Sequence, residues 1–494
     1  MSPDPTQAAN AINLCCEGRS DSRFCVESCL GIIGGGDLLN ELIPNCVDIV
    51  FNELVEPTCV GSCPEIVEAI HIPVTTDVPW RPRSFDVHAD GSIAMHAMVN
   101  AGTIDFGNGA MATVASPTQF VTVFEADGSA RWLRTLSSGH PDAFSTFGQL
   151  AKFDDAGNVV ATGELHTTVD LGSGDLTPVG GADILVAKWS RDGALLWARS
   201  FGSSGSDLAH GVEADGSETV FLAEFADTID LGEGAHLNAG AADILVARLD
   251  AAGDLLGSRA HGGPDIDIPW TLAIHEGGEY TIGGGVSTGA DFGDGPITSA
   301  GDQDSFIARF AADGTLRWQH IYGGPTWDIA YQMDSHADTS VVADYLSSGR
   351  IDVGGESIEG PNQPLIRMEA DGSVGWVNDN PVAGEVGGFA VLGVSASDAG
   401  IFVSATSGTA QANLGGGAHE AFSSTDMIPA SYALDGSYRW SMRLGGPLTE
   451  DLSYFTSLSS GGSIFIGVMI DQIDYGPGDL VGEGRDLFIL RFAD

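Results

Sequence analysis

Acidic residues recur along the chain at a nearly constant interval, and carboxylates are groups that bind metal ions or transfer protons. An apolar–Asp–apolar–Gly pattern appears seven times, at intervals of 65, 60, 61, 61, 61 and 61 residues. Its acidic or amide positions are Asp105, Asp170, Asp230, Asp291, Asp352, Asn413 and Asp474. Asn413 keeps the acceptor oxygen without the charge, which a turn tolerates and a metal site does not favour. We therefore interpret these residues as acceptors for turn amides.

A second acidic set has the same period but lies in other loops. These residues follow the recurring Trp-containing segments and are Asp142, Asp207, Asp265, Asp267, Asp328, Glu450 and Asp451. In a ring of repeats such loops would form an acidic rim on one face. Ca²⁺ takes about six to eight oxygen ligands, so the calcium candidates are Asp207, Asp265, Asp267, Asp328 and Asp451. No continuous D-x-D-x-D-G loop is present, and solvated or turn-capping Asp is the favoured interpretation.

All seven cysteines precede residue 64: Cys15, Cys16, Cys25, Cys29, Cys46, Cys59 and Cys63. The pairs Cys25/Cys29 and Cys59/Cys63 have i, i+4 spacing, which places both sulfurs on one face if the backbone is helical. We expect a small, helical, cysteine-rich module over residues 1–65. Disulfides, which imply an oxidising compartment, are favoured over a tetrahedral Zn²⁺ site. The odd count leaves one thiol free or paired with another chain.

Other potential catalytic motifs fail on context. Gly285-Val-Ser-Thr-Gly289 matches a nucleophile elbow, but no helix follows it as that motif requires. The histidines lack H-E-x-x-H spacing, and His88, His275 and His336 fall beside the same repeated turn. The recurring Trp residues favour contacts between neighbouring repeats over a quinone cofactor. We therefore predict no catalytic residues and no cofactor, with Ca²⁺ as the open alternative.

The repeat predicts four short strands per unit. In the second complete unit these strands are 210–214, 219–225, 244–249 and 255–259. The third strand begins at Asp in most units (Asp183, Asp243, Asp304, Asp426 and Asp486), with Gln119 and Gln363 near this place in the first and fifth repeats. It ends at an Asp-Gly hairpin signal such as Asp192-Gly193. A Trp follows this turn (Trp132, Trp197, Trp318, Trp376 and Trp440), with Gly257 in its place in the third repeat.

Short strands at this spacing predict an all-β, seven-bladed β-propeller over residues 66–494, with four strands in each blade. A parallel β-helix is the main structural alternative. The last repeat ends one strand early, at residues 490–494. Counting back from the first repeat places the missing strand within Ile66–Val74. We expect this segment to complete the seventh blade and close the ring.

Three quoted segments resemble the SBBP family of bacterial β-propeller repeats. They are Gly180-Gly-Ala-Asp-Ile-Leu-Val-Ala-Lys188, Asp313-Gly-Thr-Leu-Arg-Trp318 and Tyr322-Gly-Gly324. The resemblance covers residues 80–494 and is specific in the combination of motifs. Family members are typically secreted or surface proteins of environmental bacteria, mostly without an assigned activity. The resemblance therefore supports the propeller fold and a location outside the cell, and says little about function.

Composition narrows the partners. The 494 residues carry a formal net charge of −48, and Lys152 and Lys188 are the only lysines. Such a field repels nucleic acids and anionic membrane surfaces. The sequence also lacks a long apolar stretch and, at this N-terminus, a visible signal peptide. We predict a secreted or cell-surface, non-catalytic propeller that binds a protein or glycan, with the cysteine module as cap, anchor or cross-link. A polysaccharide hydrolase or lyase and an intracellular scaffold are the alternatives.

Overall fold

The computed structural model describes residues 59–493, with gaps at 62, 77, 108–110, 139–148, 216, 347–349, 354, 360–362, 379–388, 408–411, 420–425, 446–450, 459–460 and 476–478. The chain divides into two compact units, residues 1–57 and 58–494. The cysteine-rich module expected at 1–65, with its helical structure, lies outside the described part up to residue 58. All strands described here belong to the second unit.

The described residues of the second unit form seven antiparallel sheets of four or five strands, here numbered 1 to 7. Sheet 1 contains β4 (Trp80–Val87), β5 (Ile93–Val99), β8 (Thr118–Phe124) and β9 (Ala130–Ser138). Sheet 2 contains β10 (Ala151–Phe153), β11 (Val159–Leu165), β14 (Asp183–Trp189) and β15 (Leu195–Phe201). Sheet 3 contains β16 (Leu208–Ala214), β17 (Glu218–Phe225), β20 (Asp243–Asp250) and β21 (Leu255–His261). The four strands of sheet 3 match the four predicted for that unit within two residues.

Sheets 4 and 5 contain β22 (Ile268–Ile274), β23 (Tyr280–Val286), β24 (Asp304–Phe310) and β25 (Leu316–Tyr322); and β26 (Asp328–His336), β27 (Thr339–Leu346), β30 (Leu365–Met368) and β31 (Val374–Asn378). Sheets 6 and 7 contain β32 (Phe389–Ser397), β33 (Gly400–Ser407), β36 (Asp426–Tyr432), β37 (Tyr438–Met442) and β1 (Cys59–Gly61); and β38 (Asp451–Ser457), β39 (Ser463–Asp474), β40 (Asp479–Phe492) and β2 (Ile66–Ile72). The all-β prediction is confirmed, and antiparallel pairing throughout these sheets rules out a parallel β-helix.

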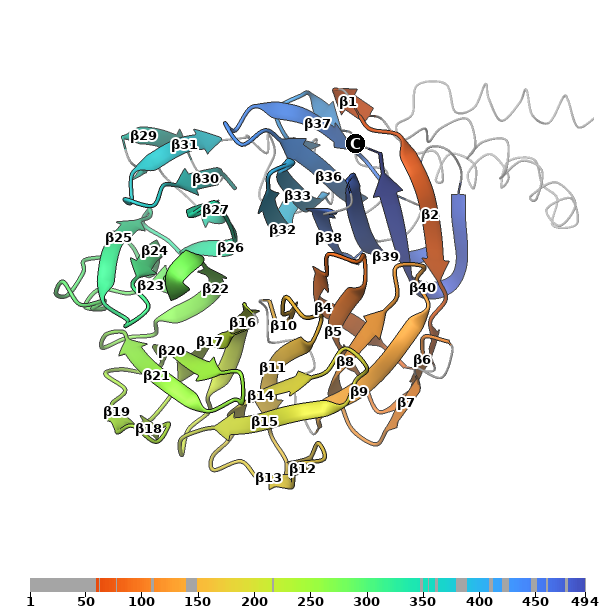
Figure 1. Cartoon of the computed structure of the whole chain (residues 1–494). Coiled ribbons are helices and arrows are strands. Elements are labelled where there is room, and N and C mark those ends of the chain that lie inside the picture. Colours follow the sequence, from red (N-terminus) through yellow and green to blue (C-terminus); the bar gives the residue numbers. More distant parts are fainter. Residues whose placement is uncertain are drawn as a thin grey trace, which may run out of the picture. The chain divides into compact units, whose positions relative to one another are not determined.

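The first strands of the seven sheets surround a common centre (Figure 1). They contact one another in the cyclic order β4, β10, β16, β22, β26, β32, β38 and again β4. In the described part of the chain, seven clusters of buried apolar residues lie between neighbouring sheets, and the cluster between sheets 7 and 1 includes Ile72, Phe85 and Ile489. The core is therefore divided into seven inter-sheet layers, because each sheet buries both of its faces against its neighbours.

The repeated Asp/Asn residues lie at the tips of small hairpins beside these sheets. Among the hairpin strands are β3 (Thr75–Thr76), β6 (Gly102–Asp105), β7 (Met111–Val114), β12 (Val169–Asp170), β13 (Asp175–Leu176), β18 (Ile229–Asp230), β19 (Ala235–His236), β28 (Arg350–Val353), β29 (Glu356–Glu359), β34 (Ala412–Asn413) and β35 (Ala418–His419). Asp230 Oδ1 accepts the amides of Gly232 and Gly234, at 2.8 and 3.2 Å. Equivalent bonds occur at Asp105, Asp170, Asp291, Asp352 and Asn413, so the turn interpretation is confirmed at six positions. The Asp474 side chain lies outside the described part.

The segment before the first sheet closes the ring as expected. Strand β2 pairs with β40, with Ile72 opposite Leu487 and Ile66 opposite Phe492. Strand β1, which was not anticipated, adds a fifth strand to sheet 6 by pairing with β37. One chain segment thus joins the outer edges of two neighbouring sheets.

Cys59 and Cys63, one of the two cysteine pairs with i, i+4 spacing, form a disulfide. The helical expectation for this pair is wrong, because Cys59 lies in strand β1. The free edge of β37 pairs with residues 59–61, and Gly61 then reverses the chain with a φ of +93°. The oxidised pair leaves no thiolate for zinc at these two positions, and the other five cysteines lie outside the described residues.

The recurring Trp residues join neighbouring sheets. The indole Nε1 of Trp132 donates to the carbonyl of Arg191 at 2.9 Å, in the hairpin turn of the next sheet. Trp197, Trp318 and Trp376 make the same contact with the next turn. A Cβ at Gly193 would lie 2.7 Å from Trp132 Cγ, so the turn glycine is required by this packing as well as by its φ of +78°.

Ring closure by β2 can be tested with two residues of that strand. Ile72 is 4% exposed in the core between sheets 7 and 1, whereas Val67 is 59% exposed. We expect Ile72→Ala to lower the free energy of unfolding by about 2–4 kcal/mol, because it leaves a cavity. Val67→Ala should change it by less than about 0.5 kcal/mol. Urea unfolding measures both, and equal effects would contradict the placement of β2.

Candidate functional site

Three of the predicted rim carboxylates are buried and hold loops together. Asp207, Asp267 and Asp328 are each 0% exposed. Asp207 accepts the amide of Ser203 at 2.6 Å, and Asp267 accepts those of Gly263 and Ser287 at 2.7 and 2.8 Å. Asp328 accepts the amide of Gly324 at 2.6 Å. These three residues are therefore turn-capping groups, as the favoured interpretation predicted, and because they are buried they do not form an exposed acidic rim.

The remaining rim candidates do not complete a metal site among the described residues. Asp265 is exposed, and Asp451 begins β38 with a side chain outside the described part. Asp142 and Glu450 also lie outside it. Within the described ranges, no three His, Cys, Asp or Glu side chains are grouped to hold a metal ion.

Burial raises the pKa values of two of these loop carboxylates. It raises the pKa of Asp267 to about 6, although the amides of Ser287 and Gly263 favour the charged form. Burial likewise raises the pKa of Asp207, against hydrogen bonds from Ser203 and Ala226. The amides offset part of this burial cost by donating hydrogen bonds to the carboxylates, which gives Asp207 and Asp267 a structural role in their loops.

The first strands bring together a charged cluster that the sequence analysis missed. Lys152 Nζ in β10 lies 3.5 Å from Asp86 Oδ1 in β4 and 3.2 Å from Glu213 Oε1 in β16. Asp334 in β26 and Tyr454 in β38 also act on Lys152 electrostatically. The side chains of Lys152, Asp86 and Glu213 are 12%, 14% and 14% exposed. Five sheets therefore contribute to one central network, here called the Lys152 cluster (Lys152, Asp86, Glu213, Asp334 and Tyr454).

One ammonium serves three carboxylates in this cluster. Burial opposes the charge on Lys152, but Glu213 and Asp86 outweigh it and hold its pKa well above the usual value. Burial raises the pKa of Glu213 to about 7, against the attraction of Lys152. Burial also raises the pKa of Asp334. The carboxylates thus favour the charged form of Lys152, and burial places the pKa of Glu213 near neutral pH.

Side chains fill the ring centre beside this cluster. Residues Arg83, His210, Trp270 and Tyr331 each sit at a β-bulge of their first strand. The Trp270 ring lies 6.1 Å from that of His210 and 5.3 Å from that of Tyr331. The amide of Gln149 donates to Met333 O across the centre, at 3.5 Å. Bulges re-aim side chains, and here they produce a layer of aromatic and polar groups in the centre.

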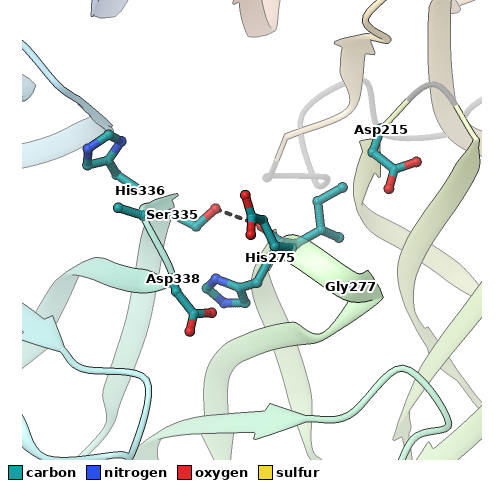
Figure 2. A pocket seen from close by; sticks show the side chains of 9 residues that line it. Asp215, His275, Gly277, Ser335, His336 and Asp338 are labelled. Carbon is teal, nitrogen blue, oxygen red and sulfur yellow. Dashed lines mark hydrogen bonds between the residues drawn. The ribbon is translucent and has the colours of Figure 1, made fainter.

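A cavity of about 640 Å³ opens where three of the first strands end (Figure 2). Three segments form its lining. They are Asp215, which follows β16; residues 274–277, which run from the end of β22 into the 3-10 turn η1 (Glu276–Gly278); and residues 335–338, which run from the end of β26 into the turn before β27. Asp215, Glu276 and Asp338 are its acidic residues. Arg309, which is 2% exposed, pairs with Asp338 through its guanidinium.

His275 and a strained turn distinguish this cavity. His275 is 8% exposed, and its Nε2 lies 2.8 Å from Thr281 Oγ1 while its buried Nδ1 has no hydrogen-bond partner. Burial lowers the pKa of His275 to about 4, so the ring is neutral at pH 7. Ala337 and Asp338 have φ values of +45° and +68°, which non-glycine residues rarely adopt. The equivalent turn of sheet 4 uses Gly277 and Gly278.

The other sequence candidates have structural partners. Ser287 of the nucleophile-elbow match donates to Ile266 O at 2.9 Å, and no helix follows it. His88 lies 2.9 Å from Asp90, and His336 lies 3.2 Å from Asp398, both beside the first turn of their sheets. Gln119 and Gln363, which occur where other repeats have Asp, accept the amides of Glu164 and Val391.

No protein-family model and no curated protein matches the chain. Solved structures with partial likeness include a protein of unknown function from Dyadobacter fermentans, with a TM-score of 0.40, 9% identity and coverage of 87% of this chain and 99% of that chain. The WD40 domain of Neurospora crassa Pan2 has a TM-score of 0.38 and 12% identity, with coverage of 87% of this chain and 100% of that chain. Lignostilbene dioxygenase from Pseudomonas brassicacearum has a TM-score of 0.37 and 13% identity, with coverage of 80% of this chain and 94% of that chain.

The two lysines allow a matched test of the Lys152 cluster. Lys188 is also buried, but it pairs with one carboxylate, Asp154, at 2.8 Å. We expect Lys152→Met to lower the free energy of unfolding by about 3–5 kcal/mol at pH 8, because it leaves uncompensated buried charge. The loss should shrink toward pH 5. Glu213 has a folded pKa near 7, above its usual 4.5, so its ionisation lowers stability as pH rises through this interval. Lys152 opposes this effect in the wild type, so its removal costs more at pH 8, where Glu213 is ionised, than at pH 5.

Lys188→Met is the control for this pH dependence. The pKa of Asp154 is lowered in the folded protein, with burial opposing and hydrogen bonds from Lys188 and Asn158 prevailing. Its contribution is therefore present above the unfolded pKa of about 3.8 and is lost only below it. Urea unfolding at pH 5 and 8 should give a constant loss for Lys188→Met. A constant loss for Lys152→Met as well would refute the shared-charge interpretation.

Proposed function

We propose that the chain is a secreted or cell-surface binding protein, built as a seven-bladed β-propeller of SBBP-type repeats and without catalytic activity. The cyclic contacts of seven first strands and the seven inter-sheet cores support seven blades. The pairing of β2 with β40 supports closure by the N-terminal strand. The N-terminal cysteine module then acts as a cap, anchor or cross-link on this ring.

The partner binds at the ring face that carries the cavity, and it is a protein with a basic segment. The observation that carries this proposal is the cavity itself, because three neighbouring sheets contribute polar side chains to one concave site. Glu276 and Asp338 are exposed there, and the buried Nδ1 of His275 has no hydrogen-bond partner. Together with the net charge of −48, these groups favour a cationic ligand.

One observation supports a location outside the cell. The Cys59–Cys63 disulfide is typical of oxidising compartments. Among the described residues, no helix is long and apolar enough to cross a membrane.

A polysaccharide-acting enzyme is the second candidate, and the Lys152 cluster is the observation that favours it. Asp86 and Glu213 both contact Lys152 Nζ, so their oxygens lie within about 7 Å of each other, a separation compatible with paired glycosidase carboxylates. The pKa of Glu213 near 7 also suits a general acid. However, both carboxylates are committed to the lysine, and their side chains are about one-seventh exposed.

Peptide binding tests the leading proposal. We expect lysine- and arginine-rich peptides to bind the intact chain in anisotropy titrations, and acidic peptides of equal length not to bind. Glu276→Gln should weaken the binding roughly two- to fivefold, because it removes one charge from the cavity. Raising the salt concentration should weaken it further.

The matched control is Glu233→Gln, which removes an exposed charge beside β19, away from the cavity. It should leave peptide affinity unchanged. Equal losses in both variants would indicate a general charge effect and contradict a site at the cavity. Hydrolysis of polysaccharides by the wild-type chain, abolished by Asp86→Asn, would instead support the enzyme.

A further inference from the structure

The loops at the opposite end of the first strands carry an exposed aromatic side chain. Trp327 is 42% exposed and directly precedes β26, whereas the cavity residues 335–338 lie at the far end of the same strand and in the turn after it. Strand β26 has nine residues, which corresponds to roughly 27–30 Å. Trp327 is therefore separated from the cavity by the depth of the ring.

The exposed indole is held in a fixed position. Its Nε1 donates to Gln303 Oε1, and the Nε2 of the same glutamine donates to Ile266 O at 2.8 Å. The following residue, Asp328, is fully buried, and its amide donates to Gln303 O at 3.0 Å. The ring of Tyr345 lies 6.3 Å from the indole. An aromatic surface that is already ordered loses little conformational entropy when a ligand binds.

Ile266 extends this surface onto the neighbouring sheet. It is 46% exposed and, like Trp327, stands immediately before a buried Asp at the start of a sheet. The amides of these two Asp residues bond to the preceding loops, at 2.9 Å for Asp267 and 3.0 Å for Asp328. The repeat thus places Ile266, Trp327 and Tyr345 together, and we call these three residues the Trp327 platform.

We propose that the Trp327 platform binds a neutral or amino-substituted oligosaccharide by stacking a sugar ring on the indole. The apolar face of a pyranose ring matches a flat aromatic side chain, and the polar tip of the indole is already satisfied. Asp265 and Asp302 are exposed beside the platform, so acidic sugars are repelled. This site is independent of the basic-peptide site at the cavity.

The size of the platform favours a sugar over a protein. A stable protein interface buries about 800 Å² on each partner, whereas only three side chains make this surface. The other large apolar side chains that are exposed in the described part belong to sheets 2, 3 and 7 and their hairpins: Val67, Val179, Leu196, Leu237, Leu256 and Val481. Polar residues adjoin the platform, including Gln303 and Asp302, and can bond to sugar hydroxyls.

Titration with three hexasaccharides tests this proposal on the full chain. The probes are β-1,4-linked hexamers of glucose and glucosamine and the α-1,4-linked hexamer of galacturonic acid, and calorimetry measures their affinities. We expect the glucose or the glucosamine hexamer to bind and the galacturonic acid hexamer not to bind. Trp327→Ala should weaken binding by about tenfold or more, and Trp327→Phe by less than about threefold.

Two further variants keep the result interpretable. Gln303→Ala releases the indole and should weaken binding several-fold while leaving the aromatic ring in place. Leu196→Ala removes an apolar side chain that is 51% exposed on β15 and should leave binding unchanged. The proposal is wrong if neither the glucose nor the glucosamine hexamer binds, if Trp327→Ala binds as well as wild type, or if only a protein ligand depends on Trp327. Loss of peptide binding at the cavity would leave this result unaffected.

Discussion

Buried carboxylates that accept backbone amides hold the loops between the strands, and the ring depends on them. Where the chain passes from one sheet to the next, amides lie inside the protein without strand partners and need acceptors. Between sheets 2 and 3 Asp207 accepts the amide of Ser203, and within sheet 2, before β14, Asp183 accepts that of Val179. A Cβ at Gly202 would lie 2.1 Å from Asp183 Cγ. The glycine after the fourth strand is therefore a consequence of the buried carboxylate.

This constraint changes the meaning of the net charge. A carboxylate held by amides needs no cation, so a repeat protein can bury many acidic residues while using few basic ones. The two lysines are accordingly internal, with side chains 12% and 4% exposed. Lys152 is needed where three carboxylates meet in the ring centre and strand amides do not satisfy them all. Part of the net negative charge therefore comes from buried carboxylates that hold loops in place, and only the rest lies on the surface.

Features set by neighbouring residues could be predicted from the sequence, whereas clusters of residues that are distant in the sequence could not. Asp followed by Gly specifies a turn by itself, so the hairpin tips were predictable, and counting strands located the closing segment. The Lys152 cluster arises from residues 86, 152, 213 and 334, which meet only because the ring closes. Their spacing keeps close to the 61-residue phase, and the phase of charged residues in the first strands was the signal that could have revealed them. At Cys59, i, i+4 spacing suggested a helix, but pairing with the open edge of β37 outweighed that local pattern.

The two ends of each first strand are under different constraints, and this separates the two proposed sites. Where β16, β22 and β26 begin, buried Asp residues fix the backbone, so a side chain such as Trp327 is presented in one orientation. At the other end tight turns leave room for variation, and sheet 5 uses Ala337 and Asp338 where sheet 4 has glycines. Positive φ at such residues is unfavourable by roughly 1–3 kcal/mol each and persists only where surrounding contacts enforce it. Arg309 supplies that contact by pairing with Asp338, and it keeps an acidic turn at the cavity where two glycines would have offered no side chain.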